Sequence, residues 1–286
     1  MIKRELYGKG ESLIVVGDSK VVRVHIHTFD PGGVLSFLQK LGTMYDIRVR
    51  NMDEQHREFM SLKKTGQLRD FAILAFAEGD GLEEVLRSLG VSQVLSHLGT
   101  KRPDAEEILR VLDSVHSDKV IVLPNRKDLI DLIQKLRNLS TKDVRIIPSE
   151  TLPQGIASLI AYDYGLSLEK NLESMTRALS SVRSVEILAS RGALDLNGIT
   201  MQAERLVGIV DGTEIIETTS YDDLVEKIVE MCKDSKWEHV TIYYGKEGNV
   251  DGAEMIVNLL KEKKPGVEAE IIRGGQSSST YLISIE

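Results

Sequence analysis

Two patterns of hydrophobic and polar residues alternate along almost the whole chain. Short apolar runs, typical of buried strands, are followed by stretches in which apolar residues recur every three or four positions, typical of helices. This order predicts βαβ units and a mostly parallel sheet over the span 71–162. The strands are expected at 71–76, 91–95, 119–123 and 144–147, and the helices at 82–89, 105–114, 128–139 and 154–162.

The pattern changes after residue 166. A strong helix is expected at 168–179 with Ser167 as its N-cap, and the strands that follow have a hairpin-rich character. The clearest turn is Val210-Asp211-Gly212-Thr213, because Asp-Gly tolerates the backbone angles that tight hairpins need. Further strands are expected at 185–189, 206–211, 214–217, 240–244, 267–272 and 281–285, and further helices at 222–231 and 251–261.

The first 66 residues predict a smaller α+β unit. A hairpin is expected from 12–16 and 20–27, followed by a helix at 33–41, a strand at 45–49 and a charged helix at 53–64. Thr65-Gly66-Gln67 interrupts the periodic pattern and is the expected domain boundary. The predicted fold class is therefore α/β: a small α+β domain over 1–66, then a larger α/β region over 67–286 made of two βαβ-type halves, about 67–165 and 166–286.

The composition excludes several classes of function. Hydrophobic residues make up 42% of the 286 residues, enough for sizeable cores, and the net charge of −8 argues against nucleic acid or an anionic membrane surface as a partner. No apolar run approaches the roughly 20 residues of a membrane span, and the charged start of the chain lacks the pattern of a signal peptide. The single cysteine, Cys232, excludes an intrachain disulfide framework and fits the reducing cytosol.

The sharpest candidate site is a pair of histidines in the second predicted strand. His25 and His27 stand two apart, and because side chains alternate along a strand, both are expected on one face. Two imidazoles on one face can give a divalent metal such as zinc two of the three or four ligands it needs. His56, Asp30 and Glu54 are the candidates for a third ligand. The alternative is a polar, solvated strand face, which the spacing alone favours.

Loops of small residues follow some predicted strands, where ligands bind in open α/β sheets. The loop 274–279 is rich in donors and could hold a carboxylate or phosphate, or could be a long hairpin loop. Gly79-Asp80-Gly81 lacks the lysine of a P-loop, so a tight strand-to-helix connection is preferred there. No motif of a catalytic nucleophile, metalloprotease or nucleotide-binding loop occurs, so no catalytic residue is assigned. The ligand or partner candidates in the loop are Gly274, Gly275, Gln276 and Ser277.

A series of short motifs runs along the chain in a specific order. They are Gly10–Val16, Val24-His25-Ile26-His27-Thr28, Asp30-Pro31-Gly32, Asn51-Met52-x-Glu54-Gln55-His56, Ile147-Pro148-x-x-Thr151-x-Pro153-Gln154-Gly155, Val210-Asp211-Gly212 and Gly274-Gly275-Gln276. Each motif is modest alone. Together they resemble the ATP-binding subunits of bacterial fatty acid kinases, proteins built on a dihydroxyacetone-kinase L-type domain, and the resemblance covers essentially the whole chain.

The resemblance implies a division of labour. In that family, an N-terminal helical domain binds ATP and magnesium through aspartates, a middle domain holds a metal, and the C-terminal region docks a carrier subunit whose fatty acid becomes an acyl phosphate. This chain resembles only the middle and C-terminal parts, so ATP and Mg are expected in a domain outside it. The family's metal site also uses a cysteine upstream of the first strand. No cysteine precedes Gly10 here, so His25 and His27 carry over as zinc ligands and the third ligand does not.

The leading hypothesis is a non-catalytic portion of a fatty acid kinase, inactive as this chain alone. It would offer a metal half-site at His25 and His27 and dock the fatty-acid-carrier subunit through residues after Gln67, with a homodimer left open. The alternative is a stand-alone protein that binds a small anion or a fatty acid at the loop 274–279 and near Gly79 and Gly99. A metal-dependent hydrolase would need a complete ligand set, which we do not find.

Overall fold

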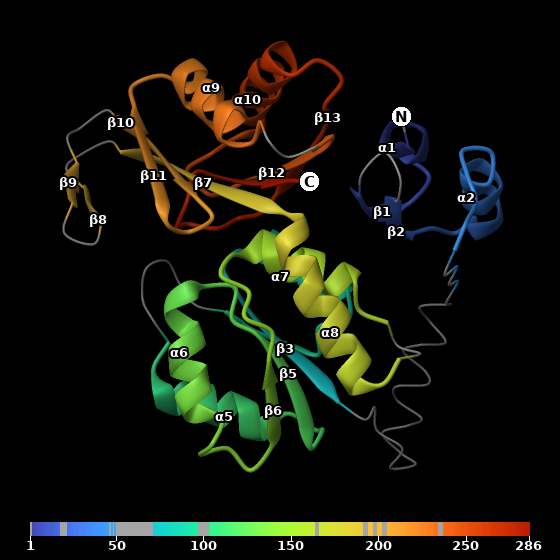
Figure 1. The fold of residues 1–286 in the computed structure, drawn as a ribbon, viewed down its shortest axis with the longest axis vertical. Coiled ribbons are helices and arrows are strands. Elements are labelled where there is room, and N and C mark those ends of the chain that lie inside the picture. Colours follow the sequence, from blue (N-terminus) through green and yellow to red (C-terminus); the bar gives the residue numbers. More distant parts are fainter. Residues whose placement is uncertain are drawn as a thin grey trace.

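The computed structural model describes residues 2–17, 22–45, 47, 49, 71–96, 103–163, 166–190, 194–196, 199–201, 205–233 and 237–286. These residues form a small N-terminal unit and a larger body of two lobes, each built on a β-sheet (Figure 1). The α/β class predicted from the sequence is confirmed.

The N-terminal unit is a β-hairpin with a helix on either side of it in sequence. Its elements are α1 (Ile2–Leu6), β1 (Glu11–Gly17), β2 (Val22–His27) and α2 (Pro31–Leu38), and β1 pairs with β2 antiparallel, as predicted. Asp30 caps α2, because its carboxylate accepts a hydrogen bond from the Gly33 N–H at 2.9 Å. The core of the unit is small, and its buried apolar residues are Leu6, Leu13, Val15 and Val34.

The segment after α2 differs from the prediction. Tyr45, Ile47 and Val49 lie in no strand, and their side chains are 82%, 52% and 57% exposed. The strand prediction is wrong at these positions, because an alternating apolar pattern forms a strand only where another strand pairs with it. The helix predicted at 53–64 and the boundary predicted at 65–67 lie outside the described residues.

The first lobe contains a parallel sheet of order β4-β3-β5-β6. Its strands are β3 (Ala72–Ala77), β4 (Gln93–Ser96), β5 (Lys119–Leu123) and β6 (Asp143–Ile146), and every neighbouring pair is parallel. Hydrophobic clusters cover both faces of this sheet, which is why its strands are continuous apolar runs in the sequence. The helices of this lobe are α4 (Asp80–Ser88), α5 (Ala105–Ser114), α6 (Lys127–Leu136) and α7 (Leu152–Ile160).

The start of α5 is set by its N-cap. Asp104 is the N-cap, and Pro103 lies directly before it. The Asp104 carboxylate accepts a hydrogen bond from the Glu107 N–H at 2.7 Å. The cap satisfies one of the free donors of the first turn and so determines where the helix starts.

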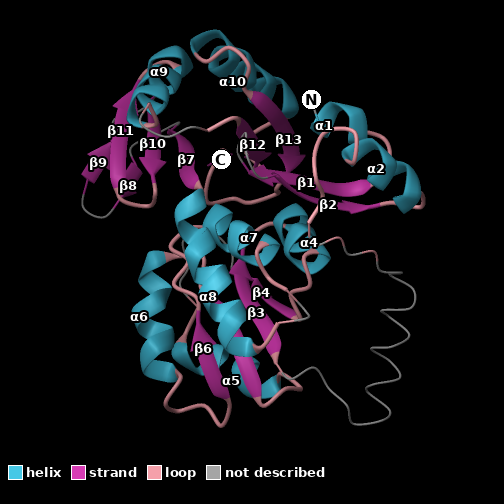
Figure 2. Ribbon diagram, turned by 45° about the vertical axis from the view of Figure 1, so that its right-hand side comes forward, coloured by secondary structure: helices cyan, strands magenta, loops and turns pink. Residues whose placement is uncertain are grey.

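The second lobe contains a mixed six-stranded sheet of order β11-β10-β7-β14-β12-β13. Within this described sheet only β12 and β13 pair in parallel. Helices α9 and α10 cover one face (Figure 2). A short hairpin, β8 with β9, was not predicted. The elements are β7 (Arg183–Ser190), β8 (Leu194–Leu196), β9 (Ile199–Met201), β10 (Arg205–Val210), β11 (Glu214–Thr218), α9 (Tyr221–Met231), β12 (His239–Tyr244), α10 (Val250–Lys263), β13 (Glu268–Arg273) and β14 (Tyr281–Ile285).

Helices α7 and α8 (Leu168–Ala178) pack against each other on the first lobe, and the short 3₁₀ helix η1 (Leu179–Ser181) leads from α8 to the second lobe (Figure 1). One hydrophobic cluster joins Leu82 and Ile156 of the first lobe with Met175 of α8. The same cluster includes Tyr243 of β12 and Leu282 of β14. The two lobes therefore share part of one core, and the ends of their strands meet at this junction.

Candidate site at the junction of the two lobes

The structure places only part of the predicted metal site. His25 and His27 lie at alternate positions of β2, opposite Ile14 and Glu11 of β1, but the side chains of both histidines and the whole of His56 fall outside the described residues. Among the residues that are described, no group of three or more His, Cys, Asp or Glu side chains could hold a metal ion. The zinc assignment stays a prediction.

The loop 274–280, which follows β13, reaches the first lobe. It joins β13 to β14, and these strands are not neighbours, because β12 lies between them and pairs with both. The hairpin alternative for this loop is therefore wrong. The Gly274 N–H donates to the Tyr244 oxygen at 2.9 Å, so the loop starts over the end of β12.

The turn Gly79-Asp80-Gly81 packs directly against this loop. The Leu82 N–H donates to the Gly274 oxygen at 3.1 Å. A Cβ atom on Gly81 would lie 1.8 Å from the Arg273 oxygen, so only glycine fits between the two backbones. Gly79 has a φ of +108°, which favours glycine for a second reason. The turn is a tight strand-to-helix connection, as preferred from the sequence, and it is also half of the contact between the lobes.

Inside this contact, Ser277 holds the side chain of Glu78, the residue that follows β3. The Ser277 N–H donates to Glu78 Oε1 at 2.9 Å, and the Ser277 hydroxyl donates to the same oxygen. Glu78 is only 8% exposed. The loop that the sequence singled out as an anion site therefore contacts a carboxylate that belongs to the chain itself.

An exposed ion pair lies at the edge of the same contact. Arg273 Nη1 and Asp80 Oδ2 are 2.6 Å apart. The hydrogen bond from the guanidinium group lowers the pKa of the Asp80 carboxyl, and the same bond raises the pKa of Arg273. Because both side chains are exposed, water screens the pair, and its contribution to stability is small.

A buried polar network ties the ends of three strands of the first lobe to α7. Asn125, with a φ of +54°, donates from Nδ2 to the Phe76 oxygen at 2.9 Å. Its Oδ1 accepts from the Ser149 hydroxyl at 2.7 Å, and a Cβ atom on Gly155 would lie 2.0 Å from that Oδ1. At the N-cap of α7, Thr151 Oγ1 is buried without a hydrogen-bond partner among the described residues.

Glu186, near the middle of β7, is a half-buried carboxylate of the second lobe. It is paired with Leu282 of β14, whose side chain belongs to the shared cluster of the junction. Burial raises the pKa of the Glu186 carboxyl, and the charge of Arg126 in the first lobe opposes that rise. The positive charge of Arg126 in the first lobe thus acts on a carboxyl group of the second lobe across the junction.

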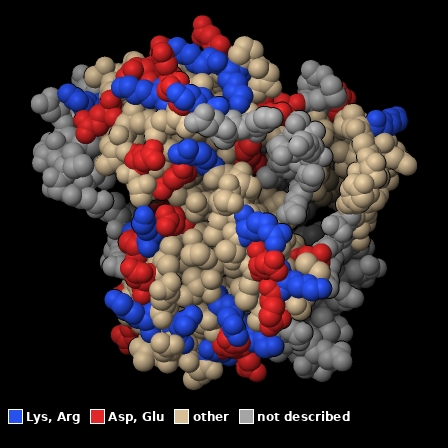
Figure 3. Space-filling model, viewed as in Figure 1, with Lys and Arg blue, Asp and Glu red and all other residues tan. Residues whose placement is uncertain are grey.

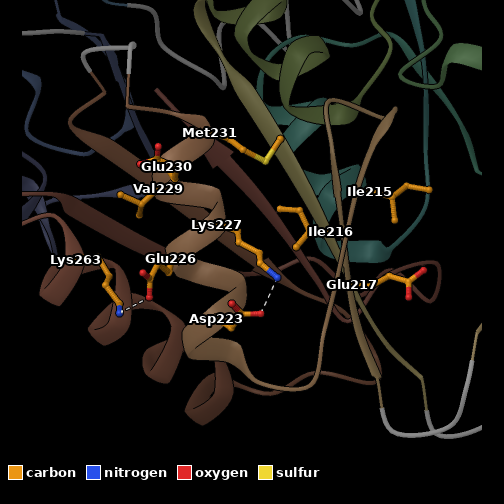
Figure 4. A pocket seen from close by; sticks show the side chains of 10 residues that line it. All are labelled: Ile215, Ile216, Glu217, Asp223, Glu226, Lys227, Val229, Glu230, Met231 and Lys263. Atoms are coloured by element: carbon orange, nitrogen blue, oxygen red, sulfur yellow. Dashed lines mark hydrogen bonds and ion pairs between the residues drawn. The ribbon is translucent and has the colours of Figure 1, made fainter.

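A groove of about 730 Å³ lies away from the junction, between β11 and α9 (Figure 4). Lys227 Nζ lies 2.8 Å from Asp223 Oδ2, and Lys263 Nζ lies 3.2 Å from Glu226 Oε2. These hydrogen bonds lower the pKa of Asp223 and raise the pKa of Lys263. Both lysines that line the groove are thus already neutralised, and a carboxylate ligand gains little there. The lining residues are Ile215, Ile216, Glu217, Asp223, Glu226, Lys227, Val229, Glu230, Met231 and Lys263.

The face shown in Figure 3 carries charges of both signs. Basic and acidic side chains are interspersed there over both lobes. No helix in the described part of the chain has the length and apolar character needed to cross a membrane. Cys232 is buried in the core of the second lobe, and burial raises the pKa of its thiol, as expected for an inert structural cysteine.

The junction was only partly visible in the sequence. Small polar residues singled out Gly274–Ser277, but their partner Glu78 was missed. The available signal was an acidic residue placed directly between a fully buried strand and a glycine turn, where a solvated acid is not expected. Gly99, which the alternative hypothesis places near the ligand together with Gly79, lies outside the described residues.

The body has the fold of two-lobed α/β proteins of the DegV class. It is similar to a DegV family protein from Corynebacterium glutamicum, with a TM-score of 0.53 and 16% identity over 76% of this chain and 96% of that chain. It is also similar to a DegV lipid-binding protein from Thermotoga maritima, with a TM-score of 0.54 and 11% identity over 76% of this chain and 98% of that chain. For the dihydroxyacetone kinase from C. freundii, the TM-score is 0.53 and the identity is 12%, over 76% of this chain and 48% of the kinase. At these identities the likeness concerns the fold.

Sequence matches place the chain more narrowly. Residues 72–286 match the C-terminal domain of the FakA-like family of fatty acid kinases, and residues 1–59 match the FakA-like middle domain. The chain therefore belongs to the FakA-like fatty acid kinase family. The family resemblance drawn from the sequence motifs is confirmed.

Curated relatives of the chain are longer than it is. An uncharacterized protein of Staphylococcus haemolyticus is 32% identical over 97% of this chain and 52% of the relative. An uncharacterized protein of Staphylococcus aureus strain MRSA252 is 28% identical, also over 97% of this chain and 52% of the relative. The chain thus spans about half the length of the curated relatives it matches.

Proposed function

We propose that this chain is the non-catalytic part of a fatty acid kinase and that it docks the fatty-acid-carrier subunit. In this proposal, the ATP and magnesium that phosphorylate the acyl carboxylate bind in a domain outside the chain. The chain supplies the surface, after Gln67, on which the carrier sits. We place this assembly in the cytosol.

The observation that supports docking over ligand storage is the filled junction between the lobes. A DegV lipid-binding protein shares this fold, so a fatty acid bound by the chain itself is the natural rival. Here Tyr243 and Leu282 complete a shared hydrophobic core with the first lobe, and Ser277 uses its two donors on Glu78. A fatty acid placed at the loop 274–279 would have to displace these contacts.

The proposal includes a zinc half-site at His25 and His27. Their alternate positions on β2 fit two ligands from one strand. The third ligand stays unassigned, because the side chains of both histidines and the whole of His56 lie outside the described residues. We expect weak metal binding. Elemental analysis of the chain purified with added Zn²⁺ measures it, and a matched variant with both histidines changed to alanine gives the background. A stoichiometric zinc ion lost in that variant would show a complete site.

Docking is tested with purified proteins. The chain is immobilised, and a fatty-acid-carrier subunit from the same organism, loaded with oleic acid, is passed over it in increasing concentration. We expect saturable binding of the carrier and none of serum albumin loaded with oleic acid, which controls for transfer of the lipid alone. Native mass spectrometry of the chain by itself should show no fatty acid, and the chain with ATP, Mg²⁺ and carrier should form no acyl phosphate.

Two results would overturn the proposal. Co-purified fatty acid together with no binding of the carrier would favour the rival, a stand-alone binding protein. Turnover of ATP to an acyl phosphate by this chain alone would show that the kinase chemistry lies within it.

A further inference from the structure

The loop 274–280 is arranged as a receptor for a carboxylate, and a carboxylate already lies against it. Two donors of Ser277, its N–H at 2.9 Å and its hydroxyl, converge on a single oxygen of Glu78. Hydrogen bonds from a backbone amide and a hydroxyl to an ionised oxygen are among the stronger ones in proteins, and successive loop amides commonly form anion sites. The chemistry is that of a binding site whose ligand is internal.

The donors are held in place by contacts that do not involve Glu78. The Lys246 N–H donates to the Gln276 oxygen at 2.7 Å, and Gln276 Nε2 donates to the Tyr243 oxygen at 3.2 Å. Gly275 has a φ of +75°, a conformation that glycine adopts without strain. Because β12 and the residues just after it hold Gln276 through its side chain and its backbone oxygen, the Ser277 donors should stay in position when the Glu78 side chain is removed.

Glu78 is equally well placed to act as the ligand. It leaves the end of β3, whose six residues are all buried, and it enters the junction beside Gly79, where a Cβ atom would lie 2.5 Å from the Gln276 N–H nitrogen. The side chain is 8% exposed, so bulk water does not compete freely for its oxygens. Removing it leaves a space of about one small carboxylate next to two oriented donors.

We infer that Ser277 and its loop form a monocarboxylate-binding site that the chain fills with its own Glu78, and that emptying it creates a site for small carboxylates such as formate or acetate. The internal carboxylate keeps external acids out and fastens the loop to the first lobe. The inference does not depend on carrier docking, because it concerns a contact within the chain.

The test is chemical rescue of the full chain carrying Glu78→Ala. Thermal unfolding is followed in 100 mM sodium formate, sodium acetate or sodium chloride at equal ionic strength. The variant should melt below the unchanged chain in chloride. A ligand at ten times its Kd stabilises by mass action, so we expect formate or acetate to raise the melting temperature of Glu78→Ala by about 2–4 °C over chloride.

Three matched controls define the site. The unchanged chain should show no formate effect, because Glu78 occupies the site. Asp80→Ala removes a neighbouring carboxylate that pairs with Arg273 outside the site, and it should show none either. Glu78→Ala combined with Ser277→Ala removes a donor and should lose most of the rescue.

If Glu78→Ala does not fold in chloride, its refolding yield in formate or acetate replaces the melting temperature. Recovery in those salts supports the inference. Failure in all three salts, while Glu78→Gln folds, would overturn it, because the contact would then be a packing contact with no affinity for a free carboxylate. Equal stabilisation by formate of the variant and of the unchanged chain would overturn it as well.

Discussion

The N-terminal unit and the two-lobed body differ in how much apolar surface each buries. The body is built around three buried clusters, one of which runs through both lobes. Among its described residues, the N-terminal unit has a buried cluster of four apolar side chains and exposes others almost fully, including Tyr7 at 84% and Phe29 at 108%. Small units with little core fold with a narrow margin. The body therefore carries most of the stability, while the N-terminal unit leaves apolar surface exposed.

The largest effect should come from the centre of the body. Phe76 is fully buried on β3, and Phe76→Ala removes most of its side chain from the core. We expect the free energy of unfolding to fall by about 3–5 kcal/mol. Urea unfolding followed by fluorescence measures it, since the single tryptophan, Trp237, is buried in the second lobe. Leu139→Ala, at a side chain that is 70% exposed, is the control and should change the midpoint little.

The next effect separates the two regions. Leu6 is fully buried in the N-terminal unit, so Leu6→Ala should destabilise that unit by about 2–3 kcal/mol. The midpoint reported by Trp237 should stay where it is, because the variant lies outside the clusters of the body, and limited proteolysis should cut the N-terminal unit sooner. An equal shift of the Trp237 midpoint would show instead that the N-terminal unit and the body unfold as one cooperative unit.

A smaller, pH-dependent effect belongs to the body alone. Burial raises the pKa of Glu186 above its ordinary 4.5, so the fold disfavours the ionised form and loses stability as the pH rises through that range. Glu186→Gln should therefore raise the melting temperature at pH 7.5 by about 1–3 °C. The gain should shrink as the pH falls and vanish below the ordinary pKa. A gain that stays constant with pH would assign the effect to packing instead.

An effect of comparable size concerns one helix end in the first lobe. Asp104→Ala removes the N-cap of α5 and should cost about 1 kcal/mol, measured by the same urea titration. Asp104→Asn keeps an acceptor and should recover most of the loss. No recovery would mean that the negative charge, rather than the hydrogen bond, matters at this helix start.

Local patterns predicted most of the body. The strand Lys119–Leu123 was predicted to the residue, because a strand buried on both faces is an uninterrupted apolar run between two helices. The turn at Asp211-Gly212 was predicted from its two residues alone, because few residue types adopt the positive φ angles of this turn. The three-residue strands β8 and β9 were missed, because segments that short have no measurable period.

Contacts distant in sequence were out of reach. Asp80 and Arg273 are 193 positions apart, and no periodicity of either segment shows that their backbones meet. The sequence indicated Ser277 as a hydrogen-bond donor, in a loop that could be an anion site or a hairpin loop. Only the tertiary structure shows that these donors bind the Glu78 carboxylate. A candidate binding loop is thus visible locally, while its occupancy depends on the tertiary fold.

The position of β14 has a consequence for biosynthesis. This strand lies between β7 and β12, so in the described sheet residues 281–285 join the antiparallel group β11-β10-β7 to the pair β12-β13. During translation, the first lobe can complete its parallel sheet while later residues are still being made. The second lobe stays as two separate sheet fragments with unpaired edges until β14 emerges from the ribosome. Edges of that kind invite wrong pairing, so this interval is when the nascent chain has the greatest need of a chaperone.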